Sequence, residues 1–372
     1  MKNVLMMVLL LSVAGGATSA PQRQGFIQIQ GATLRARMEA ALNQGRAAAP
    51  RFWTAWQFDV RPGVSVDAEW KDRSGSVTIN DGTSISTDRR IETRNLGVFV
   101  LHDNNALARL EVYNLERPHD YSGLPVYWLG RAGTDESLTY LKGLAEAQTD
   151  AKLSEQAVTA IALHDDQRIG GMLKQFISDS KVRRVRNTAV FWLGQVGGEL
   201  PFLADLARND QAEVELRRQA VFAIGISRDQ MALTTLQNLY QSVSQREVKK
   251  QIVFAVSINE NQNEAVTYLI SLATSERDPD VKKQAIFWLG QKAGERSLKF
   301  LGDTVGSNDA DTEVQKQAVF AISQRPKDEA VPLLINIART HTKAAVRRQA
   351  IFWLGQSGDE RAVAFFKELL AQ

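Results

Sequence analysis

Residues 281–290 read Val281-Lys282-Lys283-Gln284-Ala285-Ile286-Phe287-Trp288-Leu289-Gly290, and copies of this phrase recur through the C-terminal two-thirds of the chain. The tryptophan position, or an alanine in its place, returns eight times with a step of 31 to 33 residues. The eight anchors are Trp128, Ala160, Trp192, Ala223, Ala255, Trp288, Ala321 and Trp353. A regular period of this length is the sequence signature of stacked structural repeats.

The phrase has the apolar spacing of a helix that is buried on three sides. Its packed face is formed by Val281, Ala285, Trp288 and Leu289, and its two flanks by Ile286 and Phe287. Only Lys283 and Gly290 remain on the open side. Stacking between neighbouring repeats provides burial of this kind. The sequence therefore predicts a mainly α fold, an α-α superhelical solenoid of about eight helical hairpins over residues 126–372.

The phrase resembles the HEAT repeats, in particular the short bacterial form that phycobilin lyases also carry. The matching residues are a Val-Arg pair followed by Ala, as in Val185-Arg186 with Ala189 and Val346-Arg347 with Ala350, together with the Leu-Gly endings. The resemblance covers roughly residues 126–372 and implies the fold. It also implies one alternative function, a lyase-like enzyme that attaches or isomerises a tetrapyrrole.

The N-terminal third does not repeat. Residues 1–20 have the charged start, apolar run and small-residue site of a signal peptide, with cleavage expected after Ala20. We therefore expect a periplasmic or secreted protein with no membrane span after cleavage. Residues 21–50 form a lead segment in which Thr33 to Ala48 has helical spacing. Alternating apolar residues predict a small antiparallel β module over residues 51–125, placed to cap the first repeat.

Composition and motifs favour binding over catalysis. The chain has no cysteine, which excludes disulfides and thiol chemistry, and its net charge of +3 gives no reason to expect nucleic acid. Three of the four histidines precede an aspartate, at His102, His119 and His164. Adjacent side chains point in different directions, and no second histidine stands at metal-ligand spacing. We therefore expect no catalytic residue, cofactor or metal.

A column of cations is the main candidate for partner binding. Five successive repeats carry a cation at the same open position, namely Arg218, Lys250, Lys283, Lys316 and Arg348, and a second row lies beside it at Arg186, Arg217, Lys249, Lys282 and Arg347. The column suits an acidic protein or another polyanion. Against this, acidic residues stand three positions earlier in four repeats, a spacing that pairs charges on a helix. These are Glu215, Glu247, Asp280 and Glu313. Both interpretations stay open.

Aromatic residues supply three further expectations. Trp128, Trp192, Trp288 and Trp353 lie on the packed face and are expected to be structural core. Phe352 copies the flank of an interior repeat in the last copy of the phrase, which suggests self-association or partner docking at that end. Trp53, Trp56 and Trp70 offer an alternative, a sugar or peptide site in the β module. Overall we expect an exported, non-catalytic protein-protein interaction scaffold.

Overall fold

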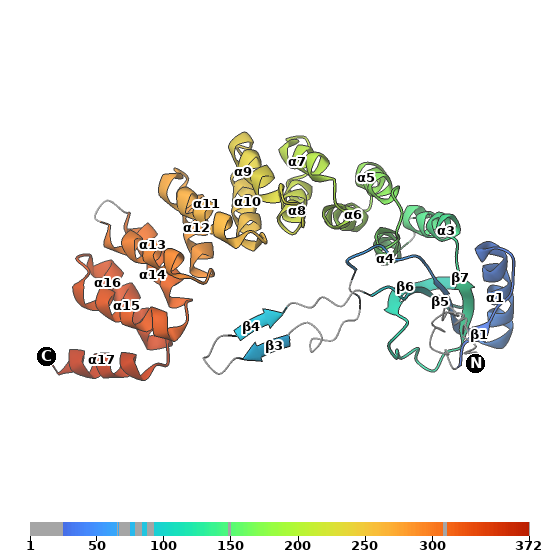
Figure 1. The fold of residues 1–372 in the computed structure, drawn as a ribbon, viewed down its shortest axis with the longest axis horizontal. Coiled ribbons are helices and arrows are strands. Elements are labelled where there is room, and N and C mark those ends of the chain that lie inside the picture. Colours follow the sequence, from blue (N-terminus) through green and yellow to red (C-terminus); the bar gives the residue numbers. More distant parts are fainter. Residues whose placement is uncertain are drawn as a thin grey trace, which may run out of the picture. The chain divides into compact units, whose positions relative to one another are not determined.

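The computed structural model describes residues 25–64, 66, 75–78, 84–87, 93–147, 150–307 and 311–371. The predicted signal peptide, Trp70 and the expected turn at residues 80–82 lie outside these described residues. The chain forms two compact units, residues 1–140 and 141–372, which are described separately. Figure 1 shows the strands in the first unit and the run of paired helices in the second.

The first unit is built on a five-stranded sheet. Its strands are β1 (Ile27–Gln28), β2 (Arg51–Gln57), β5 (Leu96–Asp103), β6 (Ala106–Asn114) and β7 (Val126–Arg131), in the order β1-β7-β2-β5-β6. The pairs β2-β5 and β5-β6 are antiparallel, whereas β7 runs parallel to both β1 and β2. The sheet is therefore mixed, not purely antiparallel as predicted. A separate ribbon pairs β3 (Gly75–Thr78) with β4 (Ser84–Thr87).

Helix α1 (Leu34–Ala48) confirms the predicted helix in the lead segment. The Thr33 side chain accepts a hydrogen bond from the Ala36 backbone N–H at 3.1 Å, which satisfies one of the free donors at the helix start. The helix packs on the sheet so closely that a Cβ on Gly45 would come within 2.5 Å of the Phe52 ring. This contact explains why glycine stands in the last turn of α1.

Trp128 lies in strand β7 and not in a helix. The first of the eight anchors therefore does not belong to a helical repeat. Tyr127, Trp128 and Leu129 are all buried, because β7 is an interior strand with both faces covered. A short apolar run of this kind looks the same in a buried strand and in a buried helix. The prediction that repeats begin at residue 126 was wrong for this reason, and the first helix after the sheet is α3 (Thr134–Ala147).

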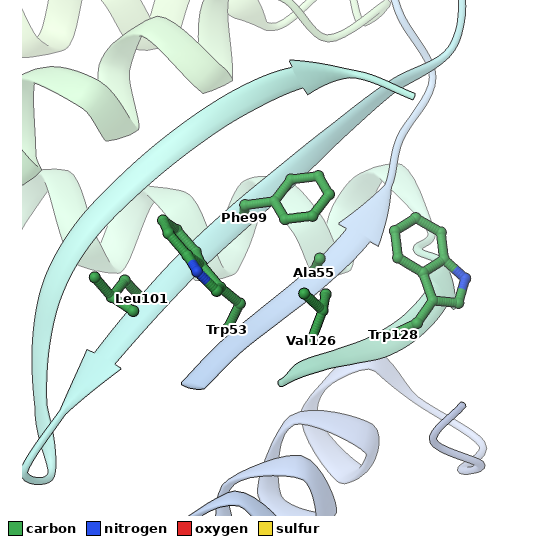
Figure 2. Packing of buried hydrophobic residues seen from close by; sticks show 6 residues of the cluster. All are labelled: Trp53, Ala55, Phe99, Leu101, Val126 and Trp128. Carbon is green, nitrogen blue, oxygen red and sulfur yellow. The ribbon is translucent and has the colours of Figure 1, made fainter. Parts of the chain in front are cut away.

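The tryptophans of the first unit are core residues of the sheet. Figure 2 shows the cluster on one face, in which Trp53 and Trp128 gather with residues of β5 and β7. Trp56 lies on the other face, where its Nε1–H donates to the Ser137 hydroxyl at 2.8 Å. Trp53 and Trp56 are 1% and 0% exposed. An open sugar or peptide site lined by these two residues is therefore contradicted.

The second unit is a two-layered solenoid, as predicted. The inner layer holds the helices that carry the repeated phrase: α4 (Ala151–Ala162), α6 (Arg183–Val196), α8 (Val214–Gly225), α10 (Arg246–Ile258), α12 (Pro279–Gly290), α14 (Thr312–Ser323) and α16 (Ala344–Gln356). The outer layer holds α5 (Ile169–Asp179), α7 (Leu200–Arg208), α9 (Ala232–Ser242), α11 (Gln262–Ser275), α13 (Glu295–Gly306), α15 (Lys327–Thr340) and α17 (Glu360–Leu370). In Figure 1, helices α6, α8, α10 and α12 lie on the inner side of the curve of this unit.

Neighbouring inner helices meet through small residues. A Cβ on Gly290 would come within 2.6 Å of the Ala321 carbonyl oxygen on the next inner helix. Gly194 stands in the same relation to Ala223, at 2.5 Å. Gly290 is therefore buried between repeats and not on the open side as the helical wheel predicted. The wheel misplaced it because a residue without a side chain carries no apolar signal, although it allows the closest approach of two backbones.

Exchange of Gly290 for alanine tests this contact. We expect Gly290→Ala to lower the free energy of unfolding by about 1 to 3 kcal/mol, because the added methyl group overpacks the contact with Ala321. Gly355 holds the same position in the last inner helix and has nothing within 4 Å of its Cβ. Gly355→Ala should therefore raise the free energy by up to about 1 kcal/mol through helix propensity. Urea unfolding followed by circular dichroism measures both, and shifts in the same direction would contradict the contact.

Candidate functional site

The open face of helices α8 to α16 in the inner layer carries three columns of side chains. The cation column is Arg218, Lys250, Lys283, Lys316 and Arg348; the glutamine column is Gln219, Gln251, Gln284, Gln317 and Gln349; the phenylalanine column is Phe222, Phe254, Phe287, Phe320 and Phe352. In each helix they occupy positions i, i+1 and i+4, which share one side of a helix. Sequence analysis identified the cation column but missed the other two, although the same phrase contains them.

The phenylalanine column forms a ladder along this face in which two pairs of rings stack on each other. Phe222 stacks on Phe254, with ring centroids 6.2 Å apart and planes 1° apart, and Phe287 stacks on Phe320 at 6.0 Å and 15°. The rings are half-buried except that of Phe352, which is 54% exposed. The ladder therefore offers an accessible aromatic strip.

The anchor tryptophans complete this ladder from the side. Trp288 packs against Phe254 and Trp353 against Phe320, each with ring centroids 5.0 Å apart. Trp192 donates a hydrogen bond through its Nε1–H to the Thr159 hydroxyl at 3.3 Å. Trp192, Trp288 and Trp353 are half-buried, unlike Trp128, which is enclosed in the sheet core of the first unit. They lie where the core meets the open face.

Three cations of the column form the ion pairs that the spacing predicts. Their nitrogen atoms lie 3.1 Å from Glu215 for Arg218, 3.7 Å from Glu247 for Lys250 and 3.0 Å from Glu313 for Lys316. Pairs with this degree of exposure contribute about 0 to 1 kcal/mol to stability. A partner carboxylate could therefore share these cations at little cost to the fold.

Lys283 and Arg348 differ from the other three cations. The expected partner of Lys283 is Asp280, but this carboxylate lies 3.4 Å from Arg246 on the preceding inner helix. Arg348 has Ala345 three residues before it. Within the part of the chain that the structure describes, neither cation has an ion pair. They are the members of the column whose charge is not locally balanced.

The second row of cations has a structural role. Four of its five side chains reach the carbonyl groups that are left free where the preceding outer helix ends, an arrangement that suits a cation, whereas the Lys249 Nζ lies over the Tyr240 ring, 4.8 Å from its centroid. The hydrogen bonds are Arg186 to Ser180 O at 3.1 Å, Arg217 to Ala207 O at 2.9 Å, Lys282 to Thr274 O at 3.3 Å and Arg347 to His341 O at 2.7 Å. In the repeat without a cation, Gln315 donates to Val305 O at 2.8 Å. This row joins the two layers.

The three His-Asp sites serve the fold. His102 is buried against the Phe52 ring, its Nε2 lies 2.9 Å from the Thr54 hydroxyl, and burial lowers its pKa to about 4. His119 stacks on Tyr113 with centroids 4.4 Å apart. His164 is buried, with Nδ1 2.8 Å from Ala160 O. Among the described residues, no group of three or more His, Cys, Asp or Glu side chains is placed to hold a metal ion.

The last outer helix exposes apolar side chains. Val363 is 51% exposed and Leu370 is 88% exposed, which adds to the exposed ring of Phe352. Self-association at this end stays a prediction.

A comparison of Arg217 with Arg218 separates the structural row from the column. Arg217 is 2% exposed and bonds to Ala207, Gln245 and Asp210. We expect Arg217→Met to lower the free energy of unfolding by about 2 to 3 kcal/mol, because a buried charged hydrogen-bond network is lost. Arg218→Met removes an exposed pair and should cost less than about 1 kcal/mol. Equal losses in urea unfolding would contradict the assignment.

Comparisons with known proteins give one family model and two solved structures that are similar to parts of the chain. A family model described as HEAT repeats matches residues 298–372. Two solved structures resemble the chain: human deoxyhypusine hydroxylase in complex with glycerol, at 19% identity over 62% of this chain and 90% of that chain with a TM-score of 0.29, and the Escherichia coli protein YibA, at 17% identity over 64% and 89% with a TM-score of 0.36. No curated protein matches the sequence. Residues 298–372, which contain the last two copies of the repeated phrase, are therefore similar to HEAT repeats.

Proposed function

We propose that the protein is an exported, non-catalytic scaffold that binds a partner protein on the three columns of its inner helices. The observation that carries this proposal is the identity of surface residue types over five successive repeats. Substitutions at surface positions away from packed features usually change stability by less than about 0.5 kcal/mol, so stability alone does not demand a cation and an amide at these positions in every repeat. A partner that contacts several repeats in the same way does require the same types of residue in each repeat.

The exposed positions of the outer helices show whether binding or duplication of the repeats explains the repeated surface residues. They share buried leucines at Leu236, Leu269, Leu301 and Leu334. Two residues before each of these, at an exposed position, stand Thr234, Thr267, Lys299 and Pro332. If the repeats were alike only because they arose by duplication, outer and inner surfaces would match equally well. Repetition restricted to the inner surface therefore supports a role for that surface.

The first twenty residues support the export part of the proposal. Their charged start, apolar run and Ala20 site have the pattern of a secretory signal. No helix among the described residues is both long enough and apolar enough to cross a membrane. The non-catalytic part of the proposal is supported by the three histidines that precede an aspartate. His102, His119 and His164 each make contacts within the fold.

Export has a direct test. The protein recovered from the periplasm or the medium should begin at Pro21, as measured by intact mass and N-terminal sequencing. Deletion of residues 2–13 should keep the protein inside the cell at its full remaining length, because the apolar run is lost. A wild-type protein that stays in the cytoplasm with its N-terminus intact would overturn the export proposal.

The scaffold proposal is tested by crosslinking in intact cells followed by mass spectrometry. We expect the double variant Lys283→Glu and Arg348→Glu to lose its crosslinked partner about tenfold, because two unbalanced cations become anions that repel an acidic surface. Lys327→Glu is the matched control, since Lys327 is exposed at the start of the outer helix α15. The same partners at the same yield in both variants would contradict binding on the columns.

A further inference from the structure

We infer that helix α17 is the interface at which two copies of this chain associate about a two-fold axis. The inference concerns a different surface from the three columns and is independent of the proposed scaffold function. It follows from three observations: apolar residues exposed on α17, two charges beside them without an ion pair, and the buried state of the first inner helix.

Helix α17 exposes apolar residues at positions that are buried in the preceding outer helix. Outer helices pack on the inner helix that follows them, as α13 does on α14 and α15 on α16. Val331 and Ala338 of α15 are 1% and 7% exposed, whereas Val363 and Leu370, at the equivalent positions of α17, are 51% and 88% exposed. Among the described residues, no inner helix follows α17. A solenoid face that stays in water needs polar side chains, so this apolar face indicates a docking surface.

Two charged residues stand beside the apolar ones. Glu360, Val363, Lys367 and Leu370 occupy positions i, i+3, i+7 and i+10 of the helix. At 100° of rotation per residue, these four positions lie on one side of α17. We call these four residues the α17 face. It has an acidic residue near its start, a basic residue near its end and apolar residues beside them.

The charges of the α17 face differ from the other charges of the helix. Arg361 and Glu368 each form an ion pair with a side chain of the preceding outer helix α15. Glu360 and Lys367 have no ion pair within the part of the chain that the structure describes. The charges that point back to the solenoid are therefore balanced, and the two on the α17 face await partners.

A second copy of the chain supplies these partners. Two α17 helices can pack antiparallel about a two-fold axis that passes midway between Val363 and Ala364. Glu360 of each copy then lies opposite Lys367 of the other, because the two residues are equally far from the axis. The same contact covers Val363 of both copies. A parallel arrangement would place like charges opposite each other, which is repulsive. The sequence of the α17 face is thus complementary to itself.

The inner layer does not allow copies to stack head to tail. Within the solenoid, Gly290 lies against Ala321 of the next inner helix. Ala160 holds the position of Ala321 in α4, the first inner helix, and it is 0% exposed. Another copy therefore finds no open position there. Copies that present the same face to each other form a closed two-fold dimer, whereas head-to-tail contacts can grow into fibres.

Sedimentation velocity of the full chain over a range of concentrations tests the interface. We expect a reversible equilibrium between one chain and two, with no larger species. Glu360→Lys and Lys367→Glu should each raise the dissociation constant of the dimer at least about tenfold, because like charges then face each other across the axis. A wild-type chain that stays monomeric at every concentration, or that grows into larger assemblies, would overturn the inference.

Mixing the two single variants separates an interface from a role within one helix. In a mixed dimer of Glu360→Lys with Lys367→Glu, opposite charges face each other again at both ends of α17. The equimolar mixture should therefore dimerise like the wild type. If the two charges acted only on the dipole of their own helix, mixing would restore nothing, and that result would contradict the interface.

An apolar position provides the second test. Val363→Asp should abolish the dimer while the midpoint of urea unfolding stays unchanged, because Val363 is exposed within one copy. Met231→Asp is the matched control, since Met231 is a 57% exposed apolar residue at the start of another outer helix, α9. Equal dimerisation of the two variants would show that the α17 face is not the interface.

Discussion

The close contact between neighbouring inner helices is the constraint on which the solenoid depends. Where Gly290 faces the Ala321 backbone, no side chain separates the two helices, and the same contact recurs at Gly194 with Ala223. Gly225 makes a similar contact with Ala255, and the equivalent position holds another small residue, Ser257 or Ser323, in α10 and α14. Because small residues at this position let successive inner helices approach closely, residues at a given position of the phrase line up as a column on the surface, and the three columns follow from this packing.

Two rows of cations in the same helices have different roles because of a single step along the chain. One residue corresponds to about 100° of rotation on a helix. Arg217 therefore points to the end of the outer helix and bonds to Ala207 O, whereas Arg218 lies on the open face beside Glu215. The first interaction holds the two layers together and is buried. The second is exposed, weak and replaceable, which is the property that a binding surface requires.

Much of the fold follows from the sequence because its signals are local and periodic. The repeated phrase predicts the inner helices, and Thr33 predicts the start of α1. The failures concern interactions that periodicity does not report. Trp128 stands in an apolar run that suits a buried strand as well as a helix. Gly290 gives no apolar signal on a helical wheel, although it makes a close contact with the next inner helix. The pairing of Asp280 with Arg246 crosses between repeats, so spacing within one helix could not predict that Lys283 is left without it.

The central claim is that the open face of the inner helices is covered by a partner in the cell. Hydroxyl-radical footprinting in intact cells, compared with the purified protein, measures this directly. The account predicts that Phe320 and Phe352 are oxidised more slowly in cells, while Met231, which is 57% exposed on the outer side, reacts equally in both. Equal oxidation of the two phenylalanines in cells and in solution would contradict the account.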